Sequence, residues 1–143
     1  MIAHLHADGA DGDPAALPRP LWYNPITARR REQNLTADAL SRIEARVAGS
    51  EAALLYATTS GCGVCVALKP KVRNLLASRF PRMAFIEVEL DAIPELGRHY
   101  NLAAVPTVIV FFEGKEHFRK TRVFGLEELA DAIGRPYRLL FDA

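Results

Sequence analysis

The chain has 143 residues, half of them apolar, and its formal net charge is +1. This length allows one domain with a hydrophobic core and is too short for two domains of ordinary size. The 18 lysines and arginines are spread along the sequence rather than gathered into a basic patch, which argues against a nucleic-acid-binding protein.

Residues 1–34 are predicted to be an N-terminal extension, and residues 1–20, rich in aspartate, glycine and proline, are expected to be flexible. The run Asp8–Asp13 faintly resembles a calcium loop, but it lacks the acidic order and the late glutamate of such loops. Leu21, Trp22 and Tyr23 are expected to dock on the core as an anchor. The alternative is that this extension mediates self-association or partner docking.

From Thr36 onward the apolar pattern becomes regular. Thr36 is expected to cap a helix that ends at Gly49, and the nearly continuous apolar run 52–58 predicts a strand buried on both faces. The segments that follow are predicted as a helix from Cys62 to Phe80, a strand at 83–90, a short helix at 93–101, a strand at 107–112, a turn at 113–115, a strand at 117–124 and a helix at 126–133 ended by Gly134. This order predicts an α/β domain with a mixed sheet over residues 35–143.

Both cysteines of the chain, Cys62 and Cys65, lie where the first predicted strand runs into a helix. Backbone N–H groups at a helix N-terminus favour an anion, and such sites lower a thiol pKa from about 8.5 to between roughly 3.5 and 7.5. Cys62 is therefore expected to be the exposed nucleophile, with Gly61 and Gly63 leaving it open. Cys65, one helical turn further on, is placed to attack a mixed disulfide on Cys62.

A metal site and two unreactive helix cysteines are the alternatives for this pair. A lone CxxC supplies only half of a usual zinc site, His99 and His117 are isolated, and His4 and His6 lie in the predicted tail. We therefore expect neither a metal nor another cofactor.

The expected location of the protein follows from its termini and its cysteines. No apolar run approaches the length of about 18 residues needed for a membrane span, and Met1–Asp13 lacks the pattern of a secretory signal. We expect a cytoplasmic protein with no membrane partner. Two cysteines cannot build a multi-bridge scaffold, and a reducing cytosol argues against a permanent disulfide, so a functional pair is favoured.

Together these motifs resemble the thioredoxin family over about residues 35–134. The resemblance rests on CGVC opening a helix, Pro70 within that helix, Asp91 after the next strand, and Val105-Pro106-Thr107. It implies a thioredoxin-like fold, a central mixed β-sheet flanked by helices. It also implies that Cys62 is the attacking thiol, Cys65 the resolving thiol and Pro106 a cis-proline facing the disulfide; an ordinary loop proline is the alternative for Pro106.

The sequence departs from the family pattern at four positions, which makes it an atypical member. Gly61 and Val64 replace a tryptophan and a proline in the motif, while Tyr56 and Glu87 replace a buried aspartate and a lysine outside it. Tyr56 cannot act as a base near neutral pH, because the unperturbed pKa of tyrosine is about 10. If the strand of Glu87 is central and covered on both faces, burial raises the pKa of Glu87, and this carboxylate can accept the Cys65 proton. The alternative is a surface glutamate.

The predicted function is a thiol–disulfide oxidoreductase that reduces disulfide-containing protein substrates through Cys62 and Cys65. Its partners would be those substrates and an electron donor such as a thioredoxin reductase. The alternative is a peptide-binding or chaperone-like module with little redox activity. That module would hold extended peptides in the groove around Cys62, Val105 and Pro106. The residues predicted to line the substrate groove are Gly61, Gly63, Val64 and Val105.

Overall fold

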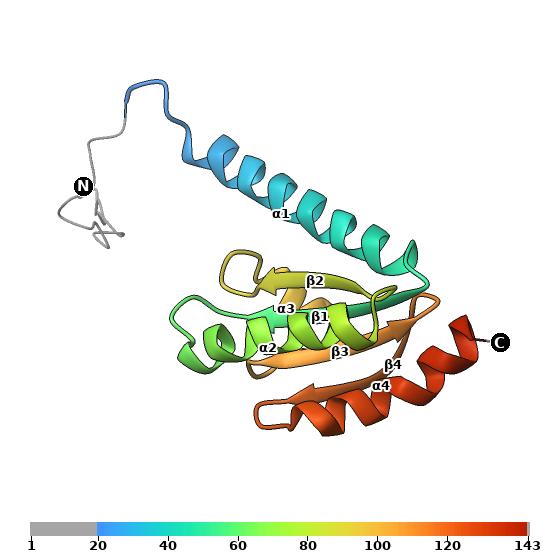
Figure 1. Cartoon of the computed structure of the whole chain (residues 1–143). Coiled ribbons are helices and arrows are strands. Elements are labelled where there is room, and N and C mark those ends of the chain that lie inside the picture. Colours follow the sequence, from blue (N-terminus) through green and yellow to red (C-terminus); the bar gives the residue numbers. More distant parts are fainter. Residues whose placement is uncertain (1–19, 143) are drawn as a thin grey trace, which may run out of the picture.

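The computed structural model describes residues 20–142 as a four-stranded mixed sheet with helices on both faces (Figure 1). The predicted flexible tail and the Asp8–Asp13 run lie outside the described residues, apart from Pro20. The elements in chain order are α1 Pro25–Ala48, β1 Ala52–Thr58, α2 Gly63–Arg79, β2 Ala84–Glu89, α3 Glu95–His99, β3 Thr107–Phe112, β4 Lys115–Thr121 and α4 Leu126–Phe141.

Strand β1 lies inside the sheet, whose order is β2-β1-β3-β4. It pairs in parallel with β2 and antiparallel with β3, and all seven of its residues are buried. A strand covered on both faces has no solvated side, which explains the continuous apolar run in the sequence. The register places Glu87 of β2 beside Tyr56 of β1.

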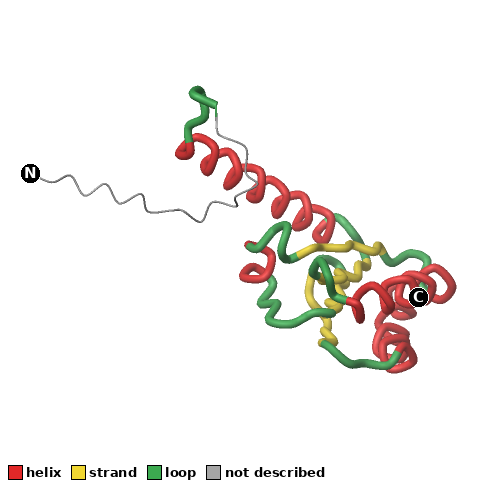
Figure 2. The backbone as a smooth tube through the Cα atoms, turned by 90° about the vertical axis from the view of Figure 1, so that its left-hand side faces the viewer, coloured by secondary structure: helices red, strands yellow, loops and turns green. Residues whose placement is uncertain are grey.

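The sheet separates two hydrophobic clusters, because successive strand residues point to opposite faces. One cluster joins Leu54, Tyr56 and Val110 to α2 and α4, and the other joins Leu55 and Ile109 to α1 and α3. Figure 2 shows these helices arranged around the strands. The predicted fold class, a central mixed sheet flanked by helices, is confirmed.

Helix α1 begins eleven residues earlier than the sequence pattern predicts, at Pro25 rather than Thr36. The side chain of Asn24 accepts hydrogen bonds from the backbone N–H groups of Ile26 and Thr27, and Pro25 occupies the first turn, where its missing N–H costs nothing. Thr36 instead lies inside the helix and donates its hydroxyl to the carbonyl of Gln33. The helix therefore crosses residue 34, and the division into an extension and a domain stays a prediction.

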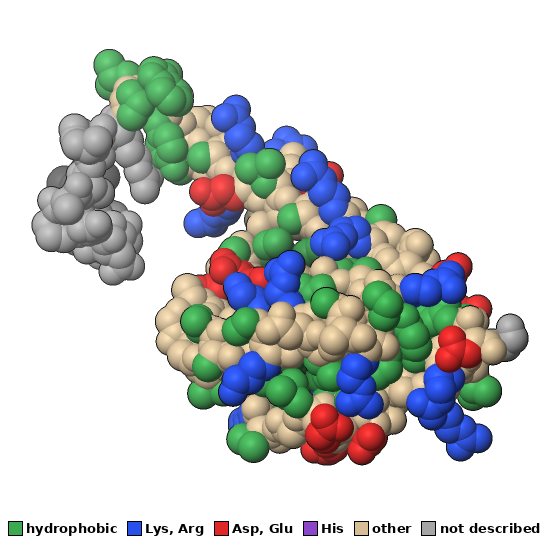
Figure 3. Space-filling view, viewed as in Figure 1, with side chains coloured by type: hydrophobic (Ala, Val, Ile, Leu, Met, Phe, Trp, Pro, Cys, Tyr) green, Lys and Arg blue, Asp and Glu red, His purple; other side chains and the backbone are tan. Residues whose placement is uncertain are grey.

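The prediction that the segment Leu21-Trp22-Tyr23 anchors on the core is wrong for Leu21 and Trp22. Leu21 and Trp22 are 107% and 83% exposed. Figure 3 shows hydrophobic side chains gathered at the free end of α1. The cause is the direction of the helix, because only the second half of α1 packs on the sheet, through Leu40, Ile43 and Val47. The first half carries these side chains away from the body of the molecule.

Other boundaries differ from expectation for local reasons. Helix α4 continues through Gly134 and Pro136 to Phe141, because Tyr137 and Phe141 extend its buried face. Strand β4 starts at Lys115, directly after Glu113 and Gly114, which both have positive φ, as a tight hairpin turn requires. Within residues 20–142, no helix is both long and apolar enough to cross a bilayer.

Candidate active site

The candidate site lies at the end of β1, where the chain turns through residues 59–61 into α2. Gly61 has φ +78°, a conformation that side-chain-bearing residues rarely adopt. Its position is otherwise open, since a Cβ there would meet nothing within 4 Å. This turn delivers Cys62 to the N-cap position of α2.

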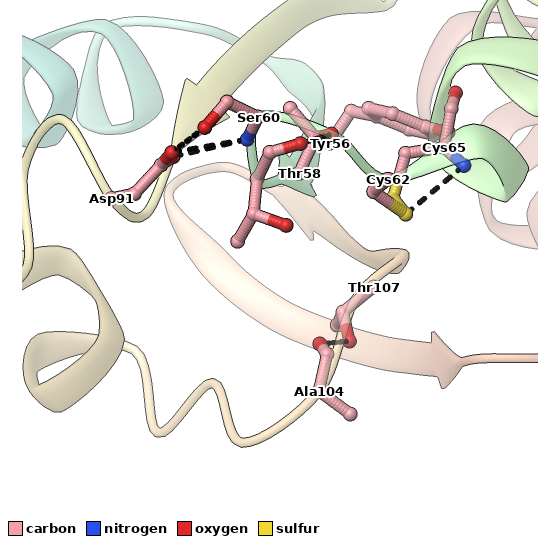
Figure 4. The surroundings of a disulfide bond; sticks show 9 residues. Tyr56, Thr58, Ser60, Cys62, Cys65, Asp91, Ala104 and Thr107 are labelled. Atoms are coloured by element: carbon pink, nitrogen blue, oxygen red, sulfur yellow. Dashed lines mark hydrogen bonds between the residues drawn. A yellow bond between two sulfur atoms is a disulfide. The ribbon is translucent and has the colours of Figure 1, made fainter.

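Cys62 and Cys65 form a disulfide with Cα atoms 5.3 Å apart (Figure 4). The backbone N–H of Cys65 also donates to Cys62 Sγ at 3.2 Å. Cys65 is 1% exposed, whereas Cys62 is only partly buried. An incoming group therefore reaches the sulfur of Cys62 first. The N–H of Cys65 and the N-terminus of α2 thus point at the sulfur of Cys62.

The side chain of Tyr56 contacts the first turn of α2. Its hydroxyl donates to the carbonyl oxygen of Cys65 at 2.7 Å in a buried position. Burial, and then the nearby Glu87 carboxylate, raise the pKa of Tyr56 to about 12, so its hydroxyl keeps its proton at neutral pH. Sequence reasoning missed this role, although a polar hydroxyl inside a fully buried strand signals a hidden acceptor.

Glu87 lies on β2, and β2 is an edge strand. The expectation of a central strand covered on both faces is therefore wrong for this position. The side chain of Glu87 is 30% exposed, and both of its carboxylate oxygens lie 3.3 Å from Lys69 Nζ of α2. Glu87 and Cys65 nevertheless line the same small cavity of about 120 Å³, together with Tyr56 and Lys69.

Asp91 fixes the loop that precedes Cys62. Its carboxylate accepts a hydrogen bond from the backbone N–H of Ser60 at 3.1 Å and another from the Ser60 hydroxyl (Figure 4). These hydrogen bonds lower the pKa of Asp91, and the one from the Ser60 hydroxyl has the larger effect. The carboxylate thus ties the β1–α2 loop to the segment after β2.

The Val105–Pro106 peptide bond is cis, as the family resemblance implied. The Thr107 hydroxyl donates to the carbonyl of Ala104 at 2.7 Å, and Figure 4 places this turn across from Cys62 and Cys65. Val105 packs against the same hydrophobic cluster as Cys62.

The predicted groove residues lie in the segment around Cys62 and in the turn before Pro106. Gly61, Gly63 and Val64 are exposed, and Val105 is half-buried. Val66, which sequence reasoning did not select, adds a further exposed apolar side chain on the first turn of α2. A small, largely apolar surface therefore borders the accessible sulfur.

The two histidines weighed as metal ligands have other contacts. His99 Nε2 lies 2.8 Å from the carboxylate of Glu44, and the His117 ring packs against Phe112 and Phe118. Within residues 20–142, no three histidine, cysteine, aspartate or glutamate side chains are grouped so that they could hold a metal ion.

A sequence model of the thioredoxin family matches residues 36–135. The chain belongs to the thioredoxin family. Its relatives include the thioredoxin-like protein YdfQ from Bacillus subtilis (strain 168), which is 29% identical over 101 residues that cover 71% of this chain and 89% of that protein.

Two solved thioredoxins share the fold at low sequence identity. Thioredoxin O2 from Arabidopsis thaliana, in its oxidized state, aligns with a TM-score of 0.61 and 24% identity over 71% of this chain and 89% of that one. Oxidised thioredoxin from Plasmodium falciparum aligns with a TM-score of 0.60 and 20% identity over 68% of this chain and 91% of that one. The thioredoxin family and fold, together with the close cysteine pair, indicate thiol–disulfide oxidoreductase chemistry.

Proposed function

We propose that this thioredoxin-family protein reduces protein disulfides by dithiol–disulfide exchange, with Cys62 as the attacking thiol and Cys65 as the resolving thiol. The observation that carries the proposal is the asymmetry of the pair. Cys62 is the accessible sulfur at the N-terminus of α2, and Cys65 is buried within bonding distance of it.

In the proposed reaction, the Cys62 thiolate attacks one sulfur of the substrate disulfide, and the other substrate sulfur leaves as a thiolate. Cys65 then loses its proton and attacks Cys62 Sγ, which releases the second substrate thiolate. Two electrons pass to the substrate, and the protein is left with the Cys62–Cys65 disulfide. A donor such as a thioredoxin reductase restores the two thiols, so the reducing direction also presupposes a reducing compartment such as the cytoplasm.

Glu87 is proposed to accept the proton from Cys65 during the resolving step. Both residues line the same cavity, and Lys69 holds the Glu87 carboxylate there by an ion pair. Tyr56 is unsuited to this task. Its pKa is raised to about 12, so at neutral pH the side chain is a protonated hydroxyl and cannot act as a base. Its contact with the Cys65 carbonyl supports a positioning role instead.

The substrate is proposed to lie across the exposed side of the disulfide. Gly61, Gly63 and Val64 border this surface on one side, and Val105 and the cis Pro106 border it on the other. The small glycines leave room for a folded substrate to approach the Cys62 sulfur.

Reduction of insulin by dithiothreitol, catalysed by the purified protein, tests the proposal. The wild-type protein should accelerate insulin reduction, and Cys62→Ser should abolish the acceleration. Cys65→Ser should retain the first attack and accumulate a mixed disulfide with the substrate, visible by mass spectrometry. Acceleration that survives Cys62→Ser would contradict the assigned roles.

A peptide-binding module is the second candidate, favoured by the exposed Val64 and Val66 beside the disulfide. This candidate predicts that unfolded peptides bind equally well to the wild type and to the Cys62→Ser, Cys65→Ser double variant, without catalysed insulin reduction. The reduction potential of the Cys62–Cys65 couple, measured against glutathione, separates a reductase from an oxidase.

A further inference from the structure

Arg122 has an unusual backbone conformation next to the candidate site. It follows the last residue of β4 and has φ +66°, in the left-handed region that favours glycine. Its backbone N–H donates to the carbonyl oxygen of Pro106 at 2.8 Å. A non-glycine residue held in this region at the edge of a reactive site is a reason to look for a role of its side chain.

The backbone of Arg122 lies at the same end of the sheet as the disulfide. Thr121 pairs with Thr107, and the hydrogen bond from Arg122 continues this contact to Pro106. Figure 4 places the turn before Thr107 across from Cys62, and Figure 1 shows the β4–α4 connection at the end of the molecule where α2 begins. Arg122 therefore flanks the Pro106 side of the proposed groove.

The neighbouring cations on β4 are already engaged. Lys120 pairs with Glu128 of α4, and Arg119 pairs with Glu116 and also donates to the carbonyl of Tyr100. The side chain of Arg122 is exposed, and none of the described residues 20–142 offers its guanidinium a hydrogen bond or an ion pair. This cation is thus available to a bound molecule.

The other side of the site carries negative charge. Glu89 and Asp91 follow each other closely at the end of β2, and Glu89 lines the cavity that also contains Gly61 and Cys65. Glu89 is exposed, and no cation among residues 20–142 pairs with it. A substrate bound over the disulfide would therefore lie between the carboxylates of Glu89 and Asp91 on the β2 side and the guanidinium of Arg122 on the Pro106 side.

We infer that Arg122 selects substrates that carry an acidic residue next to the disulfide on the Pro106 side. The inference rests on the proposed function, because it concerns which disulfides reach Cys62. Arg122 would act by touching the substrate rather than by changing the chemistry at sulfur. The expected preference is about two- to fivefold, typical of an exposed pair of opposite charges.

Four peptides that contain the same disulfide test the inference. Two of them carry glutamate or lysine on one flank of the disulfide, and the other two carry glutamate or lysine on the opposite flank. For wild-type protein at low salt, kcat/KM should favour glutamate at one flank only, by about two- to fivefold. The preference should lie mainly in KM and shrink as added salt screens the charges.

Variants of Arg122 complete the test. Arg122→Gly, which suits the positive φ, should fold and lose the preference; Arg122→Glu should invert it, and Arg122→Lys should keep it. Arg135→Glu, an exposed charge reversal on α4, is the matched control and should retain the wild-type ratio. An unchanged ratio in both Arg122→Gly and Arg122→Glu, or no preference in the wild type, overturns the inference and leaves the proposed function standing. Failure of the wild type to reduce any of the peptides contradicts the proposed function, and the inference with it.

Discussion

The Tyr56 hydroxyl donates a 2.7 Å hydrogen bond to the carbonyl oxygen of Cys65. This bond joins a buried strand to the first turn of the helix that carries both cysteines. A phenol on β1 thereby holds the backbone of Cys65 in place.

Tyr56→Phe should therefore destabilise the protein. Removing the hydroxyl leaves a buried carbonyl without this donor, which costs about 1–3 kcal/mol of unfolding free energy. Urea denaturation of the oxidised protein measures the loss. Tyr100→Phe is the matched control, because no hydrogen bond of its hydroxyl is found within residues 20–142. Equal stability of the two variants would contradict a supporting role for the Tyr56 hydroxyl.

Asp91 should make the stability of the protein depend on pH in the acidic range. Its hydrogen bonds from Ser60 lower the pKa of Asp91 in the folded state relative to the unfolded chain. The stabilisation is therefore fully present above the unfolded pKa and is lost as pH falls through the lower, folded pKa. The stability difference between wild type and Asp91→Asn, measured by urea denaturation, should be largest near neutral pH and shrink below about pH 4.

Ser60→Ala provides the complementary variant, because it removes the hydroxyl donor and keeps the backbone N–H. The pH-dependent part of its loss in unfolding free energy should be smaller than that of Asp91→Asn. A stability difference between wild type and Asp91→Asn that does not change with pH would exclude the carboxylate as its source.

Glu87→Gln should slow resolution of the mixed disulfide by tenfold or more, because a positioned general base contributes about 10²–10⁴ to a rate. The first attack by Cys62 should remain nearly unchanged. Stopped-flow kinetics with a thiol-releasing substrate separates the two steps. Glu32→Gln on α1 is the control, since Glu32 is exposed and does not line the cavity that Glu87 shares with Cys65. Unchanged resolution in Glu87→Gln between pH 6 and pH 8 would remove Glu87 from the mechanism.

The two halves of α1 should differ in their contribution to stability. Val47 is buried against the sheet, so Val47→Ala should cost about 1–2 kcal/mol of unfolding free energy. Trp22→Ala should change stability by no more than about 0.5 kcal/mol, because its side chain is 83% exposed. Thermal denaturation of both variants checks the contrast. A loss in Trp22→Ala as large as that in Val47→Ala would place Trp22 in the core after all.

The sequence was sufficient to predict the sheet, the α2 start and the cysteine pair, because these depend on local patterns. A continuous apolar run, and a cysteine placed where that run gives way to a helical pattern, can both be recognised over a few residues. The start of α1 at Pro25 was also readable from Asn24-Pro25, but the first half of this helix lacks the apolar face on which the helix prediction rested. Absence of a buried face does not prevent a capped helix from extending into solvent.

The missed features of the site depend on contacts between distant segments. Tyr56 reaches Cys65 across the strand–helix turn, and Glu87 meets Lys69 from another element. The edge position of β2 follows from strand order, which the residues of β2 alone do not encode. Arg122 could not be assigned because its φ and its bond to Pro106 exist only in the folded chain.

The overhanging half of α1 gives the molecule a segment that can unwind without breaking the core. The helix has 24 residues, and an isolated segment of half that length is marginal in water. In the overhanging half the Asn24 cap is a local support, whereas Leu40, Ile43 and Val47 hold the other half to the sheet. Amide protons before residue 36 should therefore exchange with solvent by local fraying, and those near Val47 only by opening of the packed body. The first half of α1 and the packed body then open with different free energies, although they belong to one continuous helix.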